Sequence, residues 1–499
     1  INALNTELIP KGLVDEKLIR KHHALPIFKR GNKLFVAVSD PTNLQALDEI
    51  KFQTRMSTEA ILVEEDKLSN VIEKAMDDED TSMGDLMDED LDNIDFEDEG
   101  STAAQDELDS DIDDAPVVRF VNKVLLDAIK KGVSDIHFEP YEKRFRIRTR
   151  QDGILKEVAS PPMNIANKLT SRIKVMSRMN ISERRIPQDG RIKMAISKNR
   201  AIDFRVNTCP TLYGEKIVLR ILDPTSAQVG IEQLGFEPEQ RKNFLEAIKK
   251  PYGMILVTGP TGSGKTVTLY TALNLLNSDD INISTAEDPV EITVAGINQV
   301  NVNPKTGLSF ATALRAFLRQ DPDIIMVGEI RDLETAEISV KAAQTGHLVL
   351  STLHTNDAPQ TLNRLNQMGI PPYNVASAVL LIMAQRLARK LCPSCKQLEE
   401  LPAKTLIEEG FSEEEIDDLV TYKAVGCNNC TGGYKGRVGI FQVMPVSEAM
   451  EKIIIANGTT KELEDQSMKE GIFTLRESGL QKIRAGTTSI EEINRITKD

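Results

Sequence analysis

One run of eight residues constrains the fold of this chain more than any other feature. Residues 259–266 read Gly-Pro-Thr-Gly-Ser-Gly-Lys-Thr and fit the phosphate-binding pattern G-x-x-x-x-G-K-[ST]. An apolar run at 254–257 comes directly before them, and a helix-like run at 267–276 follows. These runs supply the strand and the helix that the pattern needs, so the alternative that residues 259–266 form an ordinary turn is disfavoured. The motif therefore predicts a strand, a loop and a helix of a parallel α/β sheet.

The same loop predicts how a nucleotide is held. Glycines allow backbone N–H groups to surround phosphate oxygens, and the N-terminus of the following helix adds a positive dipole. Lys265 supplies a charge that reaches the outer phosphates, and Thr266 offers its hydroxyl to Mg²⁺. The sequence thus predicts ATP and Mg²⁺ as ligands, with these residues on the nucleotide: Thr261, Gly262, Ser263, Gly264, Lys265, Thr266 and Val267.

A second apolar run ends in a carboxylate. Residues 323–329 read Asp-Ile-Ile-Met-Val-Gly-Glu, and in a parallel sheet the C-terminal ends of strands face the ligand crevice. Glu329 is therefore placed to orient or deprotonate the water that attacks the γ-phosphate. The alternative is a structural acid that caps a helix or pairs with Arg331. Residues 283–289 are a weaker signal of the same kind and, taken alone, predict a strand and a turn.

The formal net charge of −15 is unevenly distributed along the 499 residues. Residues 77–114 hold 19 acidic residues and no Lys or Arg, so the rest of the chain carries +4 (−15 plus 19). Such a self-repelling and weakly apolar segment cannot bury enough surface to fold, and we expect a disordered linker. The alternative of a Ca²⁺ loop needs ligands at set spacing around a Gly, which this segment lacks.

The linker separates regions of different pattern. Residues 1–76 have short apolar runs between turns and suit a small α/β domain, and the start at Ile1 rather than Met indicates a trimmed chain. Residues 115–222 join a helix-like start to alternating strands, and residues 223–232 read as a hinge. Residues 233–499 alternate apolar strands with amphipathic helices, as in a parallel sheet covered on both faces. We therefore predict a multidomain α/β chain.

Four of the five cysteines form two C-x-x-C pairs: Cys392, Cys395, Cys427 and Cys430. Each pair places two thiolates on one face of a tetrahedron, so the sequence predicts a closed, structural zinc site. The 31 residues between the pairs exceed the about 15–20 of common zinc ribbons. Two disulfides or a redox pair are the alternative, which fits poorly with a reducing cytosol. Cys209 lies outside the pairs and is expected to be a buried apolar residue.

Three further blocks follow the phosphate loop, at residues 287–291, 319–332 and 345–356. Together the four blocks resemble the Walker A, Asp box, Walker B and His box of the secretion ATPase family, in a match that runs from about residue 115 to the C-terminus. The resemblance implies a RecA-like ATPase domain in which Glu329 is the catalytic carboxylate. It also implies that Glu287 helps to hold Mg²⁺ and water, and that His354 senses the γ-phosphate. Without the family, each histidine is more often structural.

Phosphoryl transfer also needs positive charge against the γ-phosphate, often from an arginine supplied from elsewhere. Arg191 and Arg205 match the family arginines that reach the phosphates in its ring assembly, and both lie in the region before the hinge. Arg315 and Arg319 match further arginines beside the Walker B strand. Taken singly, an arginine is usually a surface charge. The resemblance thus implies a homo-oligomer, a hexamer, with active sites completed between subunits.

Within the family the chain is nearer to the motors of pilus extension than to those of type II secretion, judging by residues 315–318 and 441–446. A pilus retraction motor ordinarily lacks the cysteine insert. The resemblance implies that residues 1–76 dock on an inner-membrane platform protein or its cytoplasmic adaptor. The protein would then be cytoplasmic and peripheral to the bacterial inner membrane, and no apolar run reaches the about 20 residues that span a bilayer.

Three alternatives remain open at the level of the sequence. The first is a motor of type II secretion, because it shares every catalytic block. The second is a nucleic-acid translocase, which the absence of Trp and the 4% of aromatic residues disfavour, so we expect no nucleic acid as partner. The third is a nucleotide-gated switch that hydrolyses nothing.

Overall fold

In the computed structural model of the chain, the described residues are 24–31, 33–39, 44–54, 56–63, 115–197, 200–223 and 229–498, with Val14, Ile19 and Leu68. They form two compact units, one from residues up to Lys131 and one from Gly132 onward. The predicted linker at 77–114 lies outside the described residues, as do 224–228 of the predicted hinge. Among the described residues, no helix is both long and apolar enough to cross a bilayer.

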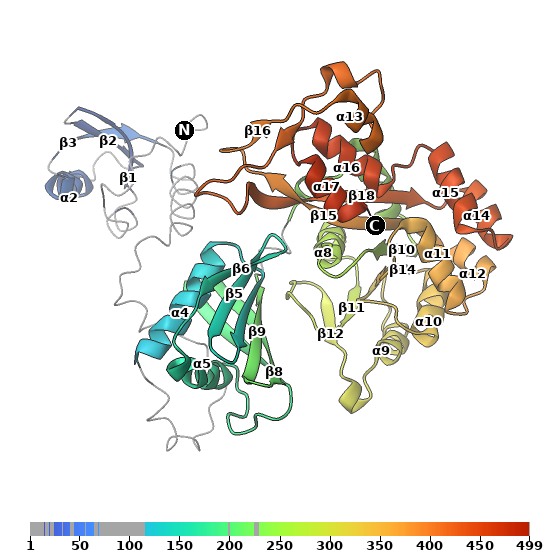
Figure 1. The fold of residues 1–499 in the computed structure, drawn as a ribbon, viewed down its shortest axis with the longest axis horizontal. Coiled ribbons are helices and arrows are strands. Elements are labelled where there is room, and N and C mark those ends of the chain that lie inside the picture. The colour runs from blue at the N-terminus through green and yellow to red at the C-terminus, as the bar shows by residue number, and fades with distance from the viewer. Residues whose placement is uncertain are drawn as a thin grey trace. The chain divides into compact units, whose positions relative to one another are not determined.

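The first unit contains a three-stranded sheet in the order β1-β2-β3 (Figure 1). Strand β1 runs antiparallel to β2, whereas β2 and β3 are parallel and are joined through α2, because parallel strands need a crossover connection. The apolar run predicted as a strand at 33–38 is β2 itself, with a buried core side. The bounds are β1 Ala24–Arg30, β2 Lys33–Val38, α2 Leu44–Thr54, β3 Ser57–Leu62 and α4 Ala115–Lys130.

The second unit begins with a six-stranded antiparallel sheet in the order β6-β5-β4-β9-β8-β7. Strands β5 and β8 alternate, so one face of the sheet buries Phe138, Phe145 and Phe204 and the other carries charged side chains. The bounds are β4 Asp135–Pro140, β5 Phe145–Gln151, β6 Ile154–Ala159, α5 Met163–Met176, β7 Gln188–Ser197, β8 Arg200–Thr211 and β9 Gly214–Leu222.

This alternation corrects one expectation. Cys209 is exposed, not buried. Phe204, Val206 and Thr208 on β8 are fully buried, so the odd positions of the strand, Cys209 among them, point to the charged face. A small apolar side chain was therefore placed on the wrong face because its strand register was not considered.

The larger part of the second unit is a seven-stranded sheet in the order β12-β11-β13-β14-β10-β15-β18. The first six strands are parallel, and β18 adds an antiparallel edge. The bounds are β10 Gly253–Thr258, β11 Ile283–Glu287, β12 Asn298–Asn301, β13 Ile324–Val327, β14 Leu348–Leu353, β15 Val379–Leu391 and β18 Tyr434–Pro445. This is the predicted parallel sheet, and its central strands are buried throughout because helices cover both faces.

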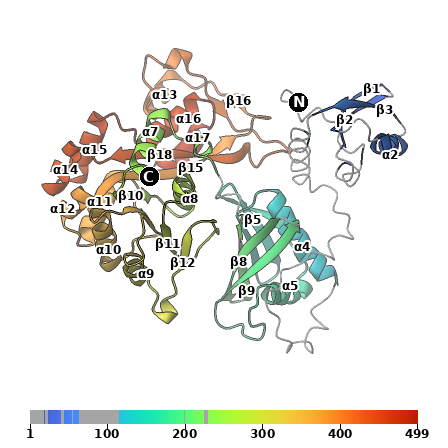
Figure 2. The same cartoon turned by 180° about the vertical axis from the view of Figure 1, so that it is seen from behind.

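Helices cover both faces of this sheet (Figures 1 and 2), and an apolar cluster lies on each face. Helices α7 and α8 contribute Phe244 and Leu273 to one cluster, whereas α9 to α12 and α14 contribute to the other. The bounds are α6 Ile231–Leu234, α7 Pro238–Ile248, α8 Lys265–Leu276, α9 Phe310–Phe317, α10 Leu333–Gln344, α11 Ala358–Gln367, α12 Pro372–Ala378 and α14 Glu448–Ile455, with the 3₁₀ turn η6 Pro304–Thr306.

Strands β15 and β18 extend beyond the sheet into a smaller region that carries the cysteine pairs. Its own core combines Ala388 and Ile440 from these strands with Leu480 and Ile493 from the last helices. The bounds are β16 Gln397–Leu398, α13 Ala403–Glu409, η7 Ile416–Asp418, β17 Tyr422–Lys423, α15 Thr460–Lys469, α16 Leu475–Arg484 and α17 Ile490–Thr497.

Candidate active site

The phosphate loop connects β10 to α8, as predicted. Its glycines adopt backbone angles that other residues rarely take, with φ of 146° at Gly259, 80° at Gly262 and 91° at Gly264. A Cβ at Gly259 would lie 2.5 Å from the carbonyl oxygen of Gln385 on the neighbouring strand. The loop therefore owes its shape both to its glycines and to β15 beside it.

Lys265 lies at the first position of α8 and donates into its own loop. Its Nζ is 2.8 Å from the carbonyl oxygen of Gly259 and 3.1 Å from that of Pro260. Burial lowers the pKa of Lys265, the charge of Glu329 opposes that change, and Arg386 reinforces it. The ammonium group is therefore electrostatically coupled to the predicted catalytic acid.

The predicted catalytic residues meet at one edge of the sheet. Glu329 follows β13, His354 follows β14 and the phosphate loop follows β10, and these three strands are neighbours. The Nε2 of His354 lies 3.4 Å from a carboxylate oxygen of Glu329. Glu329 also pairs with Arg331, which in turn lies 3.7 Å from Asp288. Both interpretations of Glu329 therefore remain open. Its place at the edge of the sheet suits a catalytic carboxylate, and its ion pair with Arg331 is the one expected of a structural acid.

Glu287 ends β11 on the same edge but is buried, with 4% of its surface exposed. Its carboxylate accepts hydrogen bonds from the hydroxyl of Tyr270 at 2.6 Å, Thr285 at 2.7 Å and the amide of Gln299 at 3.2 Å. Burial raises the pKa of Glu287, and these three donors act against the rise. A role on Mg²⁺ and water would require one of these hydrogen bonds to be exchanged.

Threonine hydroxyls join the phosphate loop to the His box. Thr258 is the last residue of β10. Its hydroxyl lies 2.6 Å from the hydroxyl of Thr355 and accepts a hydrogen bond from the Thr355 N–H at 2.9 Å. The Thr355 hydroxyl is also 2.6 Å from that of Thr361 on α11. Thr355 directly follows His354, so the position of the His354 backbone is tied to the end of β10, where the loop starts.

The two predicted inter-subunit arginines lie directly opposite each other. Arg191 on β7 pairs in register with Arg205 on β8, and Arg205 pairs in register with Arg220 on β9. Arg220 bonds to Asp135 at 3.0 Å, whereas the side chains of Arg191 and Arg205 have no hydrogen-bond or ion-pair partner among the described residues. Like charges at opposed positions repel each other, so this row concentrates positive charge on one face of the sheet.

The other two candidate arginines differ from each other. Arg315 on α9 forms an ion pair with Glu334, so its charge is already balanced. Arg319 follows the same helix, is exposed, and has no such partner in the part of the chain that the structure describes. Of the pair, only Arg319 offers an uncompensated charge.

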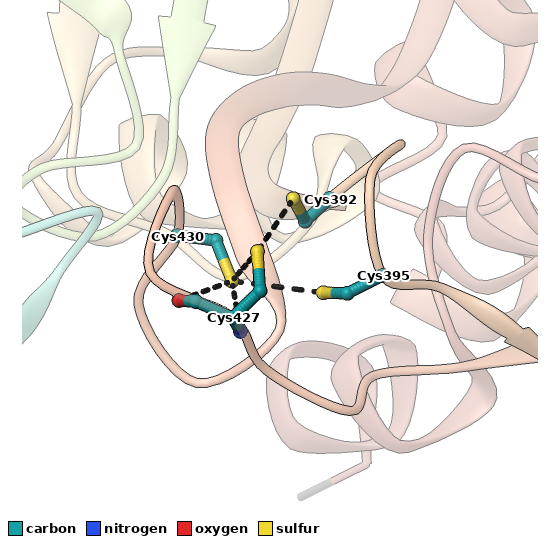
Figure 3. Close-up of side chains that lie close together, drawn as sticks. All are labelled: Cys392, Cys395, Cys427 and Cys430. Atoms are coloured by element: carbon teal, nitrogen blue, oxygen red, sulfur yellow. Dashed lines mark hydrogen bonds between the residues drawn. The ribbon is translucent and has the colours of Figure 1, made fainter.

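The four paired cysteines converge (Figure 3). All their sulfurs lie within 4.8 Å of one another, with 3.9 Å from Cys392 to Cys427 and 3.7 Å from Cys395 to Cys430. Zn–S bonds of about 2.3 Å in a tetrahedron place sulfurs about 3.8 Å apart. These separations exclude disulfides in this arrangement, and the cluster fits a zinc site.

Comparison with known proteins decides between families. The profile of the family described as Type II/IV secretion system protein matches residues 110–495, and that of the MshEN domain matches residues 3–82. The chain belongs to the Type II/IV secretion system protein family. Its relatives in that family include the type IV pilus assembly ATPase PilB of Pseudomonas aeruginosa, 58% identical over 501 residues that cover 100% of this chain and 88% of the relative.

Other members of the family are less similar. The type II secretion system ATPase E of Vibrio cholerae is 46% identical over 396 residues, which cover 79% of this chain and 78% of the relative. Among solved structures, the pilus retraction motor PilT with bound ADP matches with a TM-score of 0.54 at 27% identity, over 76% of this chain and 96% of that one. The Legionella pneumophila ATPase DotB, at 20% identity and a TM-score of 0.56 over 76% and 95%, supports the fold. The fold is the RecA-like ATPase fold predicted, and the protein is an ATPase of this family.

Several residues that contact the candidate site residues, or pair in register with them, were not found from the sequence. Tyr270 lies on a helix whose residues 268–273 are all buried, so the spacing gave no sign of which side chain meets Glu287. Arg220 follows the same alternation as Arg205 and could have been found from strand register alone. Gln385 interrupts the apolar strand β15, and a polar residue inside a buried strand is a signal that was available.

Proposed function

We propose that this protein is an ATP-hydrolysing, hexameric motor that drives assembly of type IV pili from the cytoplasmic face of the bacterial inner membrane. The observation that carries the proposal is the meeting of the phosphate loop, Glu329 and His354 at the ends of three adjacent strands. The similarity to curated pilus assembly ATPases over the whole chain supports the choice of pilus assembly over type II secretion.

The residues of the chain have separate tasks in this proposal. The N–H groups of residues 261–267 and the Lys265 ammonium bind the phosphates, and the Lys265 hydrogen bonds to Gly259 and Pro260 are exchanged for phosphate oxygens. Glu329 orients and deprotonates the attacking water, and His354, 3.4 Å away, responds to whether the γ-phosphate is present. Proton and phosphate movements then change the contacts of Glu329 with Arg331.

The proposal extends to groups that the chain would hold. Mg²⁺, held by Thr266 with Glu287 acting through water, would offset charge on the outer phosphates. Zinc, held by the four paired cysteines, would cross-link β15 to the segment that leads into β18. Arg191 and Arg205, uncompensated in the described chain, would contact the nucleotide of a neighbouring subunit, and Arg319 is the better placed of the two further candidates. Partners would be an inner-membrane platform protein and its adaptor, reached through residues 1–76.

The test replaces Glu329 with glutamine. E329Q keeps the size of the side chain but cannot accept a proton, so turnover should fall about a hundredfold or more while ADP affinity is kept. The matched control is E239Q on α7, an exposed glutamate whose one ion-pair partner in the described part of the chain is Lys242, at 3.1 Å. Equal turnover in wild type and E329Q would remove Glu329 from the chemistry, and no turnover in either would support a switch.

Expression in a cell that lacks its own pilus assembly ATPase tests the biological role. The wild-type chain should restore surface pili, and E329Q should not. Restoration of exoprotein secretion in a strain without its type II secretion ATPase, but not of pili, would favour the type II system instead.

A further inference from the structure

Gln385 is a buried amide that directly follows the apolar first half of a strand. It lies on β15 with 1% of its surface exposed, and its strand neighbours Met383, Ala384 and Ala388 are buried apolar residues. Thr258 pairs with Ala384, so Gln385 is the next position and lies beside Gly259, the first residue of the phosphate loop. An amide at such a place is costly unless both of its ends are hydrogen-bonded.

Both ends of the Gln385 amide are used, and both partners belong to the nucleotide loop and its helix. The Nε2 donates to the carbonyl oxygen of Ser263 at 2.7 Å, and the Oε1 accepts from the hydroxyl of Thr268 at 2.9 Å. A Cβ at Gly264 would lie 3.0 Å from the same Nε2. The side chain thus joins the loop to the first turn of α8 from the adjacent strand.

The bond to Ser263 determines where an amide hydrogen points. A peptide group is planar and trans, so its C=O and its N–H point in opposite directions. Because the Ser263 carbonyl is turned to Gln385, the Gly264 N–H of the same peptide is turned away from β15. Among the described residues this N–H has no hydrogen-bond acceptor. It is therefore available to an oxygen bound within the loop.

We propose that Gln385 is a positioning residue of the nucleotide site, which fixes the Ser263–Gly264 peptide so that its N–H points to the diphosphate of the bound nucleotide. The inference rests on the proposed function, since it assumes that the loop binds ATP and ADP. Packing alone does not explain why glutamine occupies position 385, because methionine or leucine would fill about the same volume without burying an amide.

The experiment measures the affinities of ligands that differ in the number of their phosphate groups. In Q385M the peptide is free to turn, and one hydrogen bond to a charged diphosphate is lost, so affinities for ADP and for pyrophosphate should fall about tenfold to a hundredfold. The affinity for AMP, which lacks the second phosphate, should stay within about threefold of wild type. The KM for ATP should rise while kcat at saturating ATP changes little, because the contact is made equally before and during the reaction.

The matched control is Gln442 on β18. It is a buried glutamine that pairs in register with Ala384 from the other side of β15, but its Oε1 accepts from the N–H of Ala358 on α11. Q442M should leave ADP affinity within about threefold of wild type. If Q442M and Q385M weaken ADP equally, or if Q385M weakens AMP as much as ADP, the effect is general loss of structure and the inference is wrong.

If Q385M does not fold, a second variant still tests the inference. Q385L removes the same donor to Ser263 with an apolar side chain of a different shape, so ADP affinity should fall by the same factor. Wild-type ADP affinity in a folded Q385L would overturn the inference. A failure of the proposed function gives a different result, because the wild-type chain itself then binds no ADP. If the wild-type chain binds ADP and Q385M binds it with the same affinity, only the role of Gln385 is removed.

Discussion

Replacing Lys174 with methionine tests how the segment that leads to Arg191 is held. Lys174 on α5 has 1% of its side chain exposed, and its Nζ donates to both carboxylate oxygens of Glu215, at 2.9 and 3.1 Å. The third hydrogen of the ammonium is used at 2.6 Å by the carbonyl oxygen of Glu183. The amide of Gln188 donates to that same carbonyl at 2.8 Å, so one buried cation anchors the residues before Arg191.

The expected magnitude follows from burial. In K174M the Glu215 carboxylate keeps its buried place, with 6% exposed, but loses the only ion-pair partner that the described residues give it. Breaking such a pair costs about 3–5 kcal/mol, which is about a hundredfold to a few thousandfold in the opening equilibrium. Replacing both partners, in K174M/E215L, should cost far less, because no buried charge then remains.

Hydrogen exchange of peptides from β8 and β9 measures this opening locally, so it does not require the whole chain to unfold in one step. Exchange should speed up strongly in K174M, much less in the double variant, and hardly at all in R144M. The last is the control, since Arg144 forms an exposed pair with Glu157 at 3.9 Å, and such pairs contribute about 0–1 kcal/mol. If K174M and R144M exchange alike, or if the double variant exchanges as fast as K174M, the reasoning is refuted.

Three further outcomes are expected. C427S or chelation of zinc should lower the melting temperature measured by calorimetry, whereas C209S, at the exposed cysteine, should not. R205A should reduce ATPase turnover of the assembled protein and leave ADP affinity of the isolated chain unchanged; a loss of ADP affinity there would contradict a role between subunits. Burial raises the pKa of Glu139, but hydrogen bonds from neighbouring cations outweigh it and lower the pKa to about 2. Its charge therefore stabilises the fold above its ordinary pKa and ceases to do so as pH falls toward 2, so wild type should lose about 3 kcal/mol relative to E139Q over that range, measured by urea unfolding.

Much of the ATPase region could be predicted because its signals are local. The loop of 259–266 requires a strand before it and a helix after it, and the structure has β10 and α8 there. Apolar runs that end in Glu287 and Glu329 became β11 and β13, whose C-terminal ends lie together because all parallel strands share one direction. The pairing of the cysteines followed in the same way from spacing, since two C-x-x-C turns can meet in a single tetrahedron.

What could not be predicted depends on neighbours that are distant in the chain. Gln385 lies 122 residues from Ser263, and nothing in its own run of sequence says that β15 is next to β10. The strand order places it there, and strand order is a property of the whole sheet. The prediction that Cys209 is buried was wrong for a related reason, because the face of β8 on which it lies is set by pairing with β7 and β9.

Under the proposed function, the charges at the nucleotide edge give a reason for arginines supplied by another subunit. Lys265 already donates to Gly259 and Pro260, and Glu329 already has Arg331 and His354 as partners. A nucleotide that binds here exchanges existing hydrogen bonds for new ones, so each contact gives only the difference between the two. The chain's own edge therefore has little unused positive charge for a γ-phosphate. By contrast, Arg191 and Arg205 stand opposed and unpaired in the described chain, and an anion placed between them would relieve a repulsion as well as form contacts. The strongest electrostatic gain on phosphate transfer is thus expected where the arginine row of one subunit meets the loop of another.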